Sequence, residues 1–329
     1  MNARLLCACR RLPCPQSSQR ELRTELTEIT NWLSKTIGDS SFNVKELRQE
    51  ASHRKYYRIE ADNTSYVLTD NFEKTDQSAN FLYASKILRN SSVNVPEVLA
   101  FSEDLRFVLL QDLGDESLDV IDKYKDEKIL EMALEQLSRI YFSDQDVLKS
   151  VTKESLLEQT NSFIDFCREN KCSNDEINAL EILRNDLVHN LLNQQFMPSH
   201  NDFERRNLMM FKEELFVIDF QDLNMGPIGI DLASIMYEHT FNYPKALINE
   251  MLETHLKDNG LKASSTELED MIMHALAHRS MRIVGTFNKY FKEGKLLNRK
   301  SDLDKFLKRI YLALSSLKKV EAKIVKKLL

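Results

Sequence analysis

One stretch of the chain, residues 200–222, concentrates the side chains that could do chemistry. His200, Asp202 and Asn207 fit the pattern H-x-D-x-x-x-x-N, and Asp219 follows Asn207 by twelve residues. Amide and carboxylate oxygens are ligands that Mg²⁺ prefers, and a carboxylate can also orient a hydroxyl and accept its proton. The spacing therefore predicts a metal site at Asn207 and Asp219 beside an acid–base residue, Asp202.

Phosphoryl transfer to a hydroxyl is the chemistry that this set predicts. Its transition state spreads negative charge over the phosphoryl oxygens, so it requires positioning and charge neutralisation above all. We assign Asp202 as the base that orients the hydroxyl, and His200 as a packed, hydrogen-bonded structural residue. The alternative is that Asp202 is a turn residue, Asn207 a cap and Asp219 a surface acid.

A predicted hairpin argues against that alternative. Residues 207–211 and 215–218 are short apolar runs joined by Lys212-Glu213-Glu214, so the hairpin returns Asp219 to the neighbourhood of Asn207. Arg206 and Asp231 are expected to lie behind the site residues and to hold them in place. Asp231 opens a helix and can also serve as its N-cap. Two roles stay open for Asp222: it contacts substrate or metal, or it makes a hydrogen bond within the loop.

The elements around the site divide the chain into two parts. Periodicity predicts a helix from near residue 21, another at 78–89, and strands at 44–49, 55–60, 66–69, 97–101 and 106–111. The rest is predicted as long helices, at 127–142, 153–169, 174–193, 231–239, 246–257 and 266–290. We expect an α+β fold of two lobes, with a five-stranded antiparallel N-lobe and a mostly helical C-lobe. The predicted domains are a disordered leader (1–20), the N-lobe (21–111), a hinge (112–115) and the C-lobe (116–329), with the ligand in the cleft.

Composition limits the partners. The 329 residues have a formal net charge of −6, which excludes the basic surplus typical of nucleic-acid-binding proteins. No apolar run approaches the roughly 20 residues that span a bilayer. The odd number of cysteines, 5, indicates a reducing compartment, the cytoplasm. We expect a monomer that binds a small-molecule substrate and neither nucleic acid nor membrane.

Several segments resemble the aminoglycoside phosphotransferase and choline kinase superfamily. They are residues 51–58, 95–100, 109–115, 206–209, 218–222 and 278–287. Within that superfamily they are most similar to the bacterial kinases that phosphorylate N-acetylmuramate and N-acetylglucosamine at the anomeric hydroxyl in peptidoglycan recycling. The resemblance implies a protein-kinase-like fold, ATP and Mg²⁺. It also implies nucleotide-binding roles for residues of the phosphate loop and the hinge, namely Ser52, His53, Arg54, Gln111 and Leu113.

The chain departs from protein kinases in the N-lobe. The third strand reads Val67-Leu68-Thr69-Asp70, without the lysine that holds the α- and β-phosphates. Helix 78–89 has no glutamate to pair with it, and residues 49–53 contain no glycine. Arg54 or Lys55 could supply the missing charge, or either could be a solvated residue of a strand edge.

Three functions therefore stay open. The first is an amino-sugar kinase, and the second is a kinase for an aminoglycoside, choline or another small alcohol. Polycationic aminoglycosides call for an acidic wall, for which the candidates are Glu154, Glu158, Asp165 and Glu169. The third is a nucleotide-binding pseudokinase, which the missing lysine and glutamate favour and the intact Asp202, Asn207 and Asp219 oppose.

Overall fold

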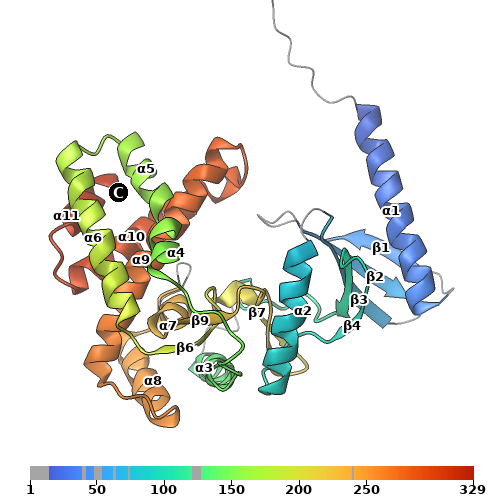
Figure 1. Cartoon of the computed structure of the whole chain (residues 1–329), viewed down its shortest axis with the longest axis horizontal. Coiled ribbons are helices and arrows are strands. Elements are labelled where there is room, and N and C mark those ends of the chain that lie inside the picture. The colour runs from blue at the N-terminus through green and yellow to red at the C-terminus, as the bar shows by residue number, and fades with distance from the viewer. Residues whose placement is uncertain are drawn as a thin grey trace, which may run out of the picture.

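The computed structural model describes residues 15–38, 42–47, 54–61, 64–72, 75–120, 127–238 and 241–329, with side chains from residue 25 onward. They form two lobes, a β-rich N-lobe and a larger helical C-lobe (Figure 1). Helix α1 (Pro15–Ile37) begins ahead of residue 21, and residues 1–14 of the expected leader lie outside the described residues. Within the described residues, no helix has the length and apolarity needed to cross a membrane.

The N-lobe is an antiparallel sheet of five strands, as predicted, and the strand order is β1-β2-β3-β5-β4. The strands are β1 (Phe42–Glu46), β2 (Lys55–Ala61), β3 (Thr64–Asp70), β4 (Val98–Phe101) and β5 (Phe107–Gln111). Helix α2 (Thr75–Asn90) is inserted after β3.

The two faces of this sheet pack into different cores. On one face, α1 covers a small cluster made by residues of α1 and of strands β2, β3 and β5, namely Ile29, Leu33, Tyr57, Ile59, Leu68, Phe107 and Leu109. On the other face, Val108 and Leu110 pack with Phe81 of α2 in the main core, which continues through the C-lobe. Alternation along the strands produces this division, because successive side chains point to opposite faces.

The C-lobe is built around one long helix, α9 (Ser265–Lys292). Its other helices are α3 (Glu127–Tyr141), α4 (Lys153–Gln159), α5 (Asn161–Glu169), α6 (Asn174–Leu192), α7 (Gly229–Met236), α8 (Lys245–Asp258), α10 (Lys300–Ser316) and α11 (Ala322–Leu328). Gly285 lets α9 approach α5 closely, because a Cβ atom there would lie 2.6 Å from the backbone nitrogen of Phe163. The close approach fixes α9, which carries several residues of the site.

Four features of the C-lobe differ from the sequence expectations. Asp231 was expected to open a helix as its N-cap, but α7 begins at Gly229 with Ile228 as its N-cap, and Asp231 lies in the first turn. The helix expected at 153–169 is broken at Thr160 into α4 and α5. The side chain of Arg184 donates to Thr160 Oγ1 at 2.9 Å and to the Leu157 carbonyl at 2.7 Å, so polar partners stabilise the break. Helix α10 and the two-stranded sheet of β6 (Phe196–Ser199) and β9 (Asn224–Pro227) were not predicted.

Candidate active site

The loop that carries Asp202 runs from the end of β6 to a short 3-10 helix, η2 (Arg205–Asn207). The predicted hairpin follows as β7 (Leu208–Phe211) and β8 (Glu214–Val217). The amide of Ile218 donates to the carbonyl of Asn207 at 2.9 Å, so the hairpin closes where Asp219 begins to emerge. The returning strand therefore places Asp219 next to the end of the loop.

His200 lies buried between these two segments. Its Nε2 lies 2.9 Å from the carbonyl oxygen of Ile218, and its Nδ1 accepts the amide of Asp202 at 3.3 Å. A carbonyl can only accept, so Nε2 carries the proton and Nδ1 is the acceptor. His200 thus links the strand before Asp219 to the backbone of Asp202.

Asp231 binds the start of the loop that carries Asp202. Its Oδ2 accepts the Ser199 hydroxyl at 2.8 Å and the amide of His200 at 2.7 Å. Burial raises the pKa of Asp231, although these hydrogen bonds oppose the shift. A carboxylate that binds two consecutive residues in this way fixes the start of the loop.

Asp202 is surrounded by arginines. Its Oδ2 accepts from Arg206 Nη2 and its Oδ1 from Arg279 Nη2, each at 2.6 Å, and Arg282 Nη2 lies 3.7 Å from Oδ1. Burial would raise the pKa of Asp202, but the charges of Arg279, Arg206 and Arg282 outweigh it and hold the pKa well below its usual range. Asp202 is therefore a stable carboxylate, better suited to orienting a hydroxyl than to removing its proton early.

Glu204 completes this ion-pair cluster. Its buried carboxylate accepts from Arg279 at 2.7 Å and pairs with Arg206 Nε. Glu204, Arg279 and Arg282 were not among the predicted site residues. The signal that could have found the two arginines is their spacing, three residues apart within the otherwise apolar stretch of α9.

Asn207 and Asp219 each keep a side-chain oxygen without a donor among the described residues; the other Asp219 oxygen, Oδ1, accepts from Gln221 Nε2 at 3.0 Å. The Asn207 amide nitrogen donates to the Asp202 carbonyl at 2.8 Å, and among the described residues nothing donates to its Oδ1. Asp219 has an exposed side chain and a left-handed backbone, with a φ of 61°. Such a conformation in a residue other than glycine is more frequent at functional sites.

The residue after Asp219 connects the site to the N-lobe. Phe220 is fully buried and stacks on Phe81 of α2, with ring centroids 4.7 Å apart. Arg54 also lies over the ring of Phe81, with its guanidinium carbon 5.9 Å from the centroid. Arg54 Nε also donates to Asn71 Oδ1 at 2.6 Å, which places it on the α2 face of the sheet.

The remaining predicted nucleotide contacts divide between the loop and the hinge. Ser52 and His53 lie outside the described residues. Lys55, an alternative source of positive charge, binds Glu25 of α1 at 2.6 Å, and α1 covers the other face of the sheet. Leu113 is buried, and within the described residues neither its amide nor its carbonyl has a hydrogen-bond partner.

The segment predicted as the hinge, residues 112–115, is held by Arg58 of β2. Its Nε donates to Asp112 Oδ2 at 2.7 Å, and its Nη2 pairs with Asp115 Oδ1 at 2.9 Å. Gln111 is directed elsewhere, because its side-chain oxygen accepts the amide of Glu97 at 3.3 Å. The amide of Gln111 also donates to the Glu97 carbonyl at 2.9 Å, so both the side chain and the amide are committed to the residue that precedes β4. A nucleotide contact from Gln111 would have to come from its backbone carbonyl.

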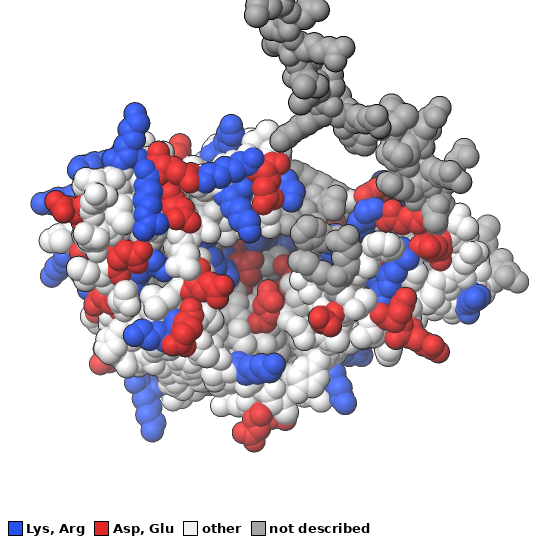
Figure 2. All heavy atoms as spheres, turned by 45° about the horizontal axis from the view of Figure 1, so that its top comes forward, with Lys and Arg blue, Asp and Glu red and all other residues white. Residues whose placement is uncertain are grey.

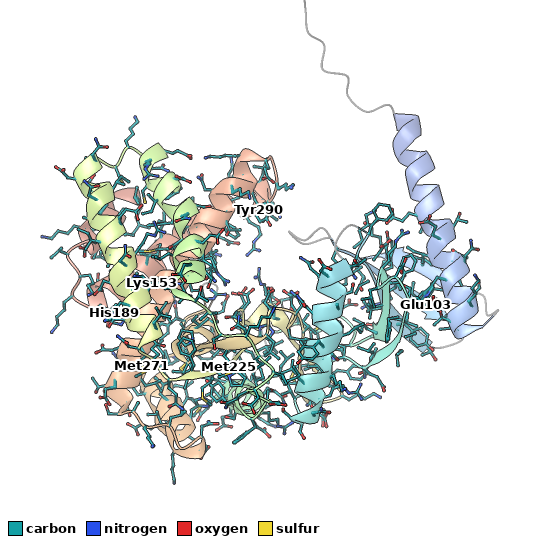
Figure 3. The ribbon with its side chains drawn as sticks, viewed as in Figure 1. Glu103, Lys153, His189, Met225, Met271 and Tyr290 are labelled. Atoms are coloured by element: carbon teal, nitrogen blue, oxygen red, sulfur yellow. The ribbon has the colours of Figure 1, made fainter. Side chains whose placement is uncertain are left out.

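A pocket of about 620 Å³ opens beside Asp202. It is lined by the 200–224 segment and by α4, α9, the short helix η3 (Leu297–Arg299) and α10. Tyr290, which lines it, lies near the end of α9 on the side that faces the N-lobe (Figure 3). The surface between the lobes is hollowed, and both acidic and basic atoms are visible there (Figure 2). The pocket is large enough for a monosaccharide-sized ligand.

The acidic wall considered for polycationic acceptors is not part of this pocket. Within the described residues, the acids that line it are Asp202, Glu204, Asp219 and Asp222. The four candidates on residues 153–169 are divided between α4 and α5, and none lines it. Asp165 pairs with Arg168, and Glu169 with Lys292 and Asn288, all on the surface.

The donor set fits a magnesium ion that also binds phosphate. Among the described residues there is no group of three His, Cys, Asp or Glu that could hold a metal ion by itself. Mg²⁺ in phosphoryl-transfer sites commonly has one or two protein ligands, and waters and phosphate oxygens supply the rest. Asn207 and Asp219 provide an amide and a carboxylate of this kind.

Two lobes, with an H-x-D loop and an Asp-Phe pair returned by a hairpin, are typical of a kinase-like phosphotransferase. The chain belongs to the phosphotransferase enzyme family (APH), whose sequence profile matches residues 43–266. This confirms the resemblance and makes the protein an enzyme that transfers a phosphoryl group to a sugar or alcohol.

Named relatives and solved structures agree with this family. A protein named N-acetylmuramate/N-acetylglucosamine kinase from Neisseria meningitidis serogroup B is 25% identical over 285 residues, 82% of this chain and 85% of that protein. One of the same name from Pseudomonas aeruginosa is 26% identical over 216 residues, 63% of each. Choline kinase LicA from Streptococcus pneumoniae is similar in structure, with a TM-score of 0.66, 14% identity and coverage of 89% of this chain and 99% of that one. The gentamicin complex of APH(2″)-IIa has a TM-score of 0.60 at 18% identity, covering 84% and 95%. These structural similarities confirm the protein-kinase-like fold.

Proposed function

We propose that the protein phosphorylates the anomeric hydroxyl of an amino sugar, N-acetylmuramate or N-acetylglucosamine, with ATP as the donor. The observation that carries the proposal is the pocket beside Asp202. The acceptor would bind against the walls formed by α4, α9, η3 and α10, and these walls contain no acidic residue among those described. The names of the relatives support the choice of sugar. ADP-bound members among the similar structures support the choice of nucleotide.

In this proposal the acceptor hydroxyl binds to Asp202. A loose transition state transfers the hydroxyl proton late, so a carboxylate of low pKa can hold the hydroxyl in line with the γ-phosphate. The proton passes to Asp202 or to the transferred phosphoryl group as the new O–P bond forms and the bond between the γ-phosphorus and the bridging oxygen breaks, which releases ADP. The arginine cluster fixes the carboxylate and keeps it ionised while the substrate binds.

Residues 21–111 and the hinge at 112–115 form the nucleotide side of the proposed site. In this proposal the unpaired backbone groups of Leu113 bind the adenine ring. The amide of Gln111 donates to the Glu97 carbonyl at 2.9 Å, so Gln111 would contribute its backbone carbonyl. Arg54 takes the place of the missing strand lysine, because it lies on the α2 face near the Phe81–Phe220 contact. Ser52 and His53 would cover the phosphates.

Asn207 and Asp219 are the proposed ligands of Mg²⁺. The chemistry that Mg²⁺ supplies when bound is neutralisation of charge on the β- and γ-phosphate oxygens. His200 and Asp231 hold the loop so that the two ligands stay in place, and Arg206 holds Asp202. A cytoplasmic monomer without nucleic-acid or membrane partners remains part of the proposal, supported by the net charge of −6 and the odd cysteine count.

A substrate panel tests the proposal. We expect ATP-dependent turnover of N-acetylmuramate or N-acetylglucosamine, and kcat/KM at least about 100-fold lower for kanamycin and choline, because the acceptor side lacks an acidic wall. A coupled ADP-release assay measures the rates, and phosphorus NMR of the product identifies the phosphorylated position. Turnover of kanamycin or choline without turnover of either sugar would contradict the proposal.

The metal assignment predicts a specific defect for Asp219→Asn. We expect the Mg²⁺ concentration at half-maximal rate to rise at least about tenfold and kcat/KM to fall about 100-fold or more, since an amide is a weaker ligand than a carboxylate. Initial rates over a magnesium titration measure both. Asp165→Asn, at an exposed surface ion pair, is the matched control. An unchanged magnesium titration would remove Asp219 from the metal site.

A further inference from the structure

We infer that the acceptor pocket selects a sugar that carries an anionic substituent, and that Arg299 is the residue that binds this group. The inference deepens the proposed function and rests on it. N-acetylmuramate carries a carboxylate on its lactyl ether, whereas N-acetylglucosamine has a hydroxyl at that position. The inference therefore distinguishes N-acetylmuramate from N-acetylglucosamine, which the proposed function treats as alternative acceptors.

Charge is distributed unevenly around the pocket. The acids that line it, among the described residues, all come from the segment 202–222 at the reacting end. The walls from α9, η3 and α10 contribute Arg282 and Arg299 and no acid. A cationic acceptor would meet like charges there, and an anionic one would meet opposite charges in a partly desolvated site, where they interact more strongly than in water.

The two arginines have different surroundings. Arg282 lies toward the reacting end, with Nη2 3.3 Å from the Asn201 carbonyl and 3.7 Å from Asp202. Arg282 therefore shares Asp202 with Arg206 and Arg279, and its charge acts at the reacting end of the pocket. Arg299 has no contact with the acids of the reacting end among its described interactions, so its charge acts on the part of the pocket formed by η3 and α10.

Arg299 is held in place before a ligand arrives. Its Nε donates to Asp302 Oδ2 at 2.9 Å, and its guanidinium lies over the ring of Phe287, 5.1 Å from the centroid. Asp302 also pairs with Lys305 at 2.9 Å, so its negative charge is shared between two cations. Within the described residues, the two terminal Nη groups of Arg299 have no hydrogen-bond partner, and the side chain remains 24% exposed. A fixed guanidinium with two free nitrogens can bind a carboxylate with little loss of entropy.

The rest of this wall suits the body of a sugar. Phe287, Tyr290 and Phe306 line it with aromatic surface, and Thr286 and Gln159 add neutral hydrogen-bonding groups. These side chains can contact the C–H groups and hydroxyls of a pyranose without adding charge. Discrimination between a charged and an uncharged sugar is therefore assigned to Arg299.

The test compares the two sugars in the wild type and in Arg299→Gln. We expect the wild type to show a kcat/KM for N-acetylmuramate at least about tenfold above that for N-acetylglucosamine, consistent with a charge-assisted hydrogen bond. In Arg299→Gln this ratio should fall to near one, and Arg299→Lys should retain part of it. Lys300→Gln removes one exposed charge from the next position and should keep the wild-type ratio.

Binding measurements separate this inference from the proposed function. Calorimetry of each sugar, with ADP and Mg²⁺ present, should show an Arg299-dependent preference for N-acetylmuramate that weakens as salt increases. Turnover with the same ratio in wild type and Arg299→Gln would overturn the inference and leave the function standing. Arg299-dependent binding without phosphorylation of either sugar would overturn the function and support the inference. Binding of neither sugar would overturn both.

Discussion

Replacing Asp202 by Asn is expected to lower kcat at least about 1,000-fold while the affinity for ATP changes by no more than a few fold. The side chain lines the acceptor pocket, and its amide replacement can no longer accept a proton or hold the hydroxyl as a carboxylate does. Single-turnover rates and equilibrium binding of a fluorescent ATP analogue measure the two effects separately. Asp146→Asn, at an exposed position, is the control.

The charge of Asp202 leads to a prediction about the pH dependence of kcat. Arg279, Arg206 and Arg282 hold the pKa of Asp202 well below its ordinary value against the effect of burial. A depressed carboxylate pKa contributes stability that is present above the unfolded pKa, about 3.9, and is lost as the pH falls through the folded pKa. Between about pH 5 and 8 the carboxylate therefore stays ionised, and its titration should leave no acidic limb in the kcat profile there.

Activity of Asp202→Asn within tenfold of wild type would exclude this residue from the mechanism.

Replacing Arg279 by Met should destabilise the protein by about 3 kcal/mol, because removal of one partner leaves buried carboxylates short of a counter-charge. Arg279 is buried and binds both Asp202 and Glu204 through Nη2. Arg206 still pairs with both carboxylates, which limits the loss. Urea unfolding followed by circular dichroism measures the change in free energy.

A matched comparison distinguishes the buried ion pairs from a general effect of losing an arginine. Arg168 makes surface pairs with Asp165 and Glu181, and Arg168→Met should cost less than about 1 kcal/mol. Arg279→Lys, which keeps the charge, should be less harmful than Arg279→Met. Equal stability losses for Arg279→Met and Arg168→Met would show that the cluster around Asp202 does not stabilise the fold.

The parts of the fold that local pattern determines could be predicted from the sequence. The five strands of the N-lobe follow from short apolar runs, and the hairpin after Asn207 follows from two such runs around Lys212-Glu213-Glu214. The residues of the H-x-D loop lie close together in the chain, so their spacing alone places them in one loop. Helix α9 was predicted at nearly its observed length because its periodicity is strong.

The parts that depend on distant contacts could not be predicted. The apolar residues around Arg279 indicate a buried arginine, but no local pattern gives its partner Asp202, which lies 77 residues away in the chain. The break at Thr160 depends on Arg184 from another helix. Lys55 pairs with Glu25 of α1, which is distant in the sequence, and this ion pair directs Lys55 away from the proposed phosphate site.

The division of the N-lobe sheet between two cores has a consequence for cooperativity. The α1 face has its own small cluster, whereas the α2 face belongs to the main core that holds Phe220 and the catalytic loop. Clusters with fewer buried contacts open at a lower free energy than the global fold. We expect the outer layer of the N-lobe to loosen as a separate folding unit, while Phe81 of α2 stays packed on Phe220.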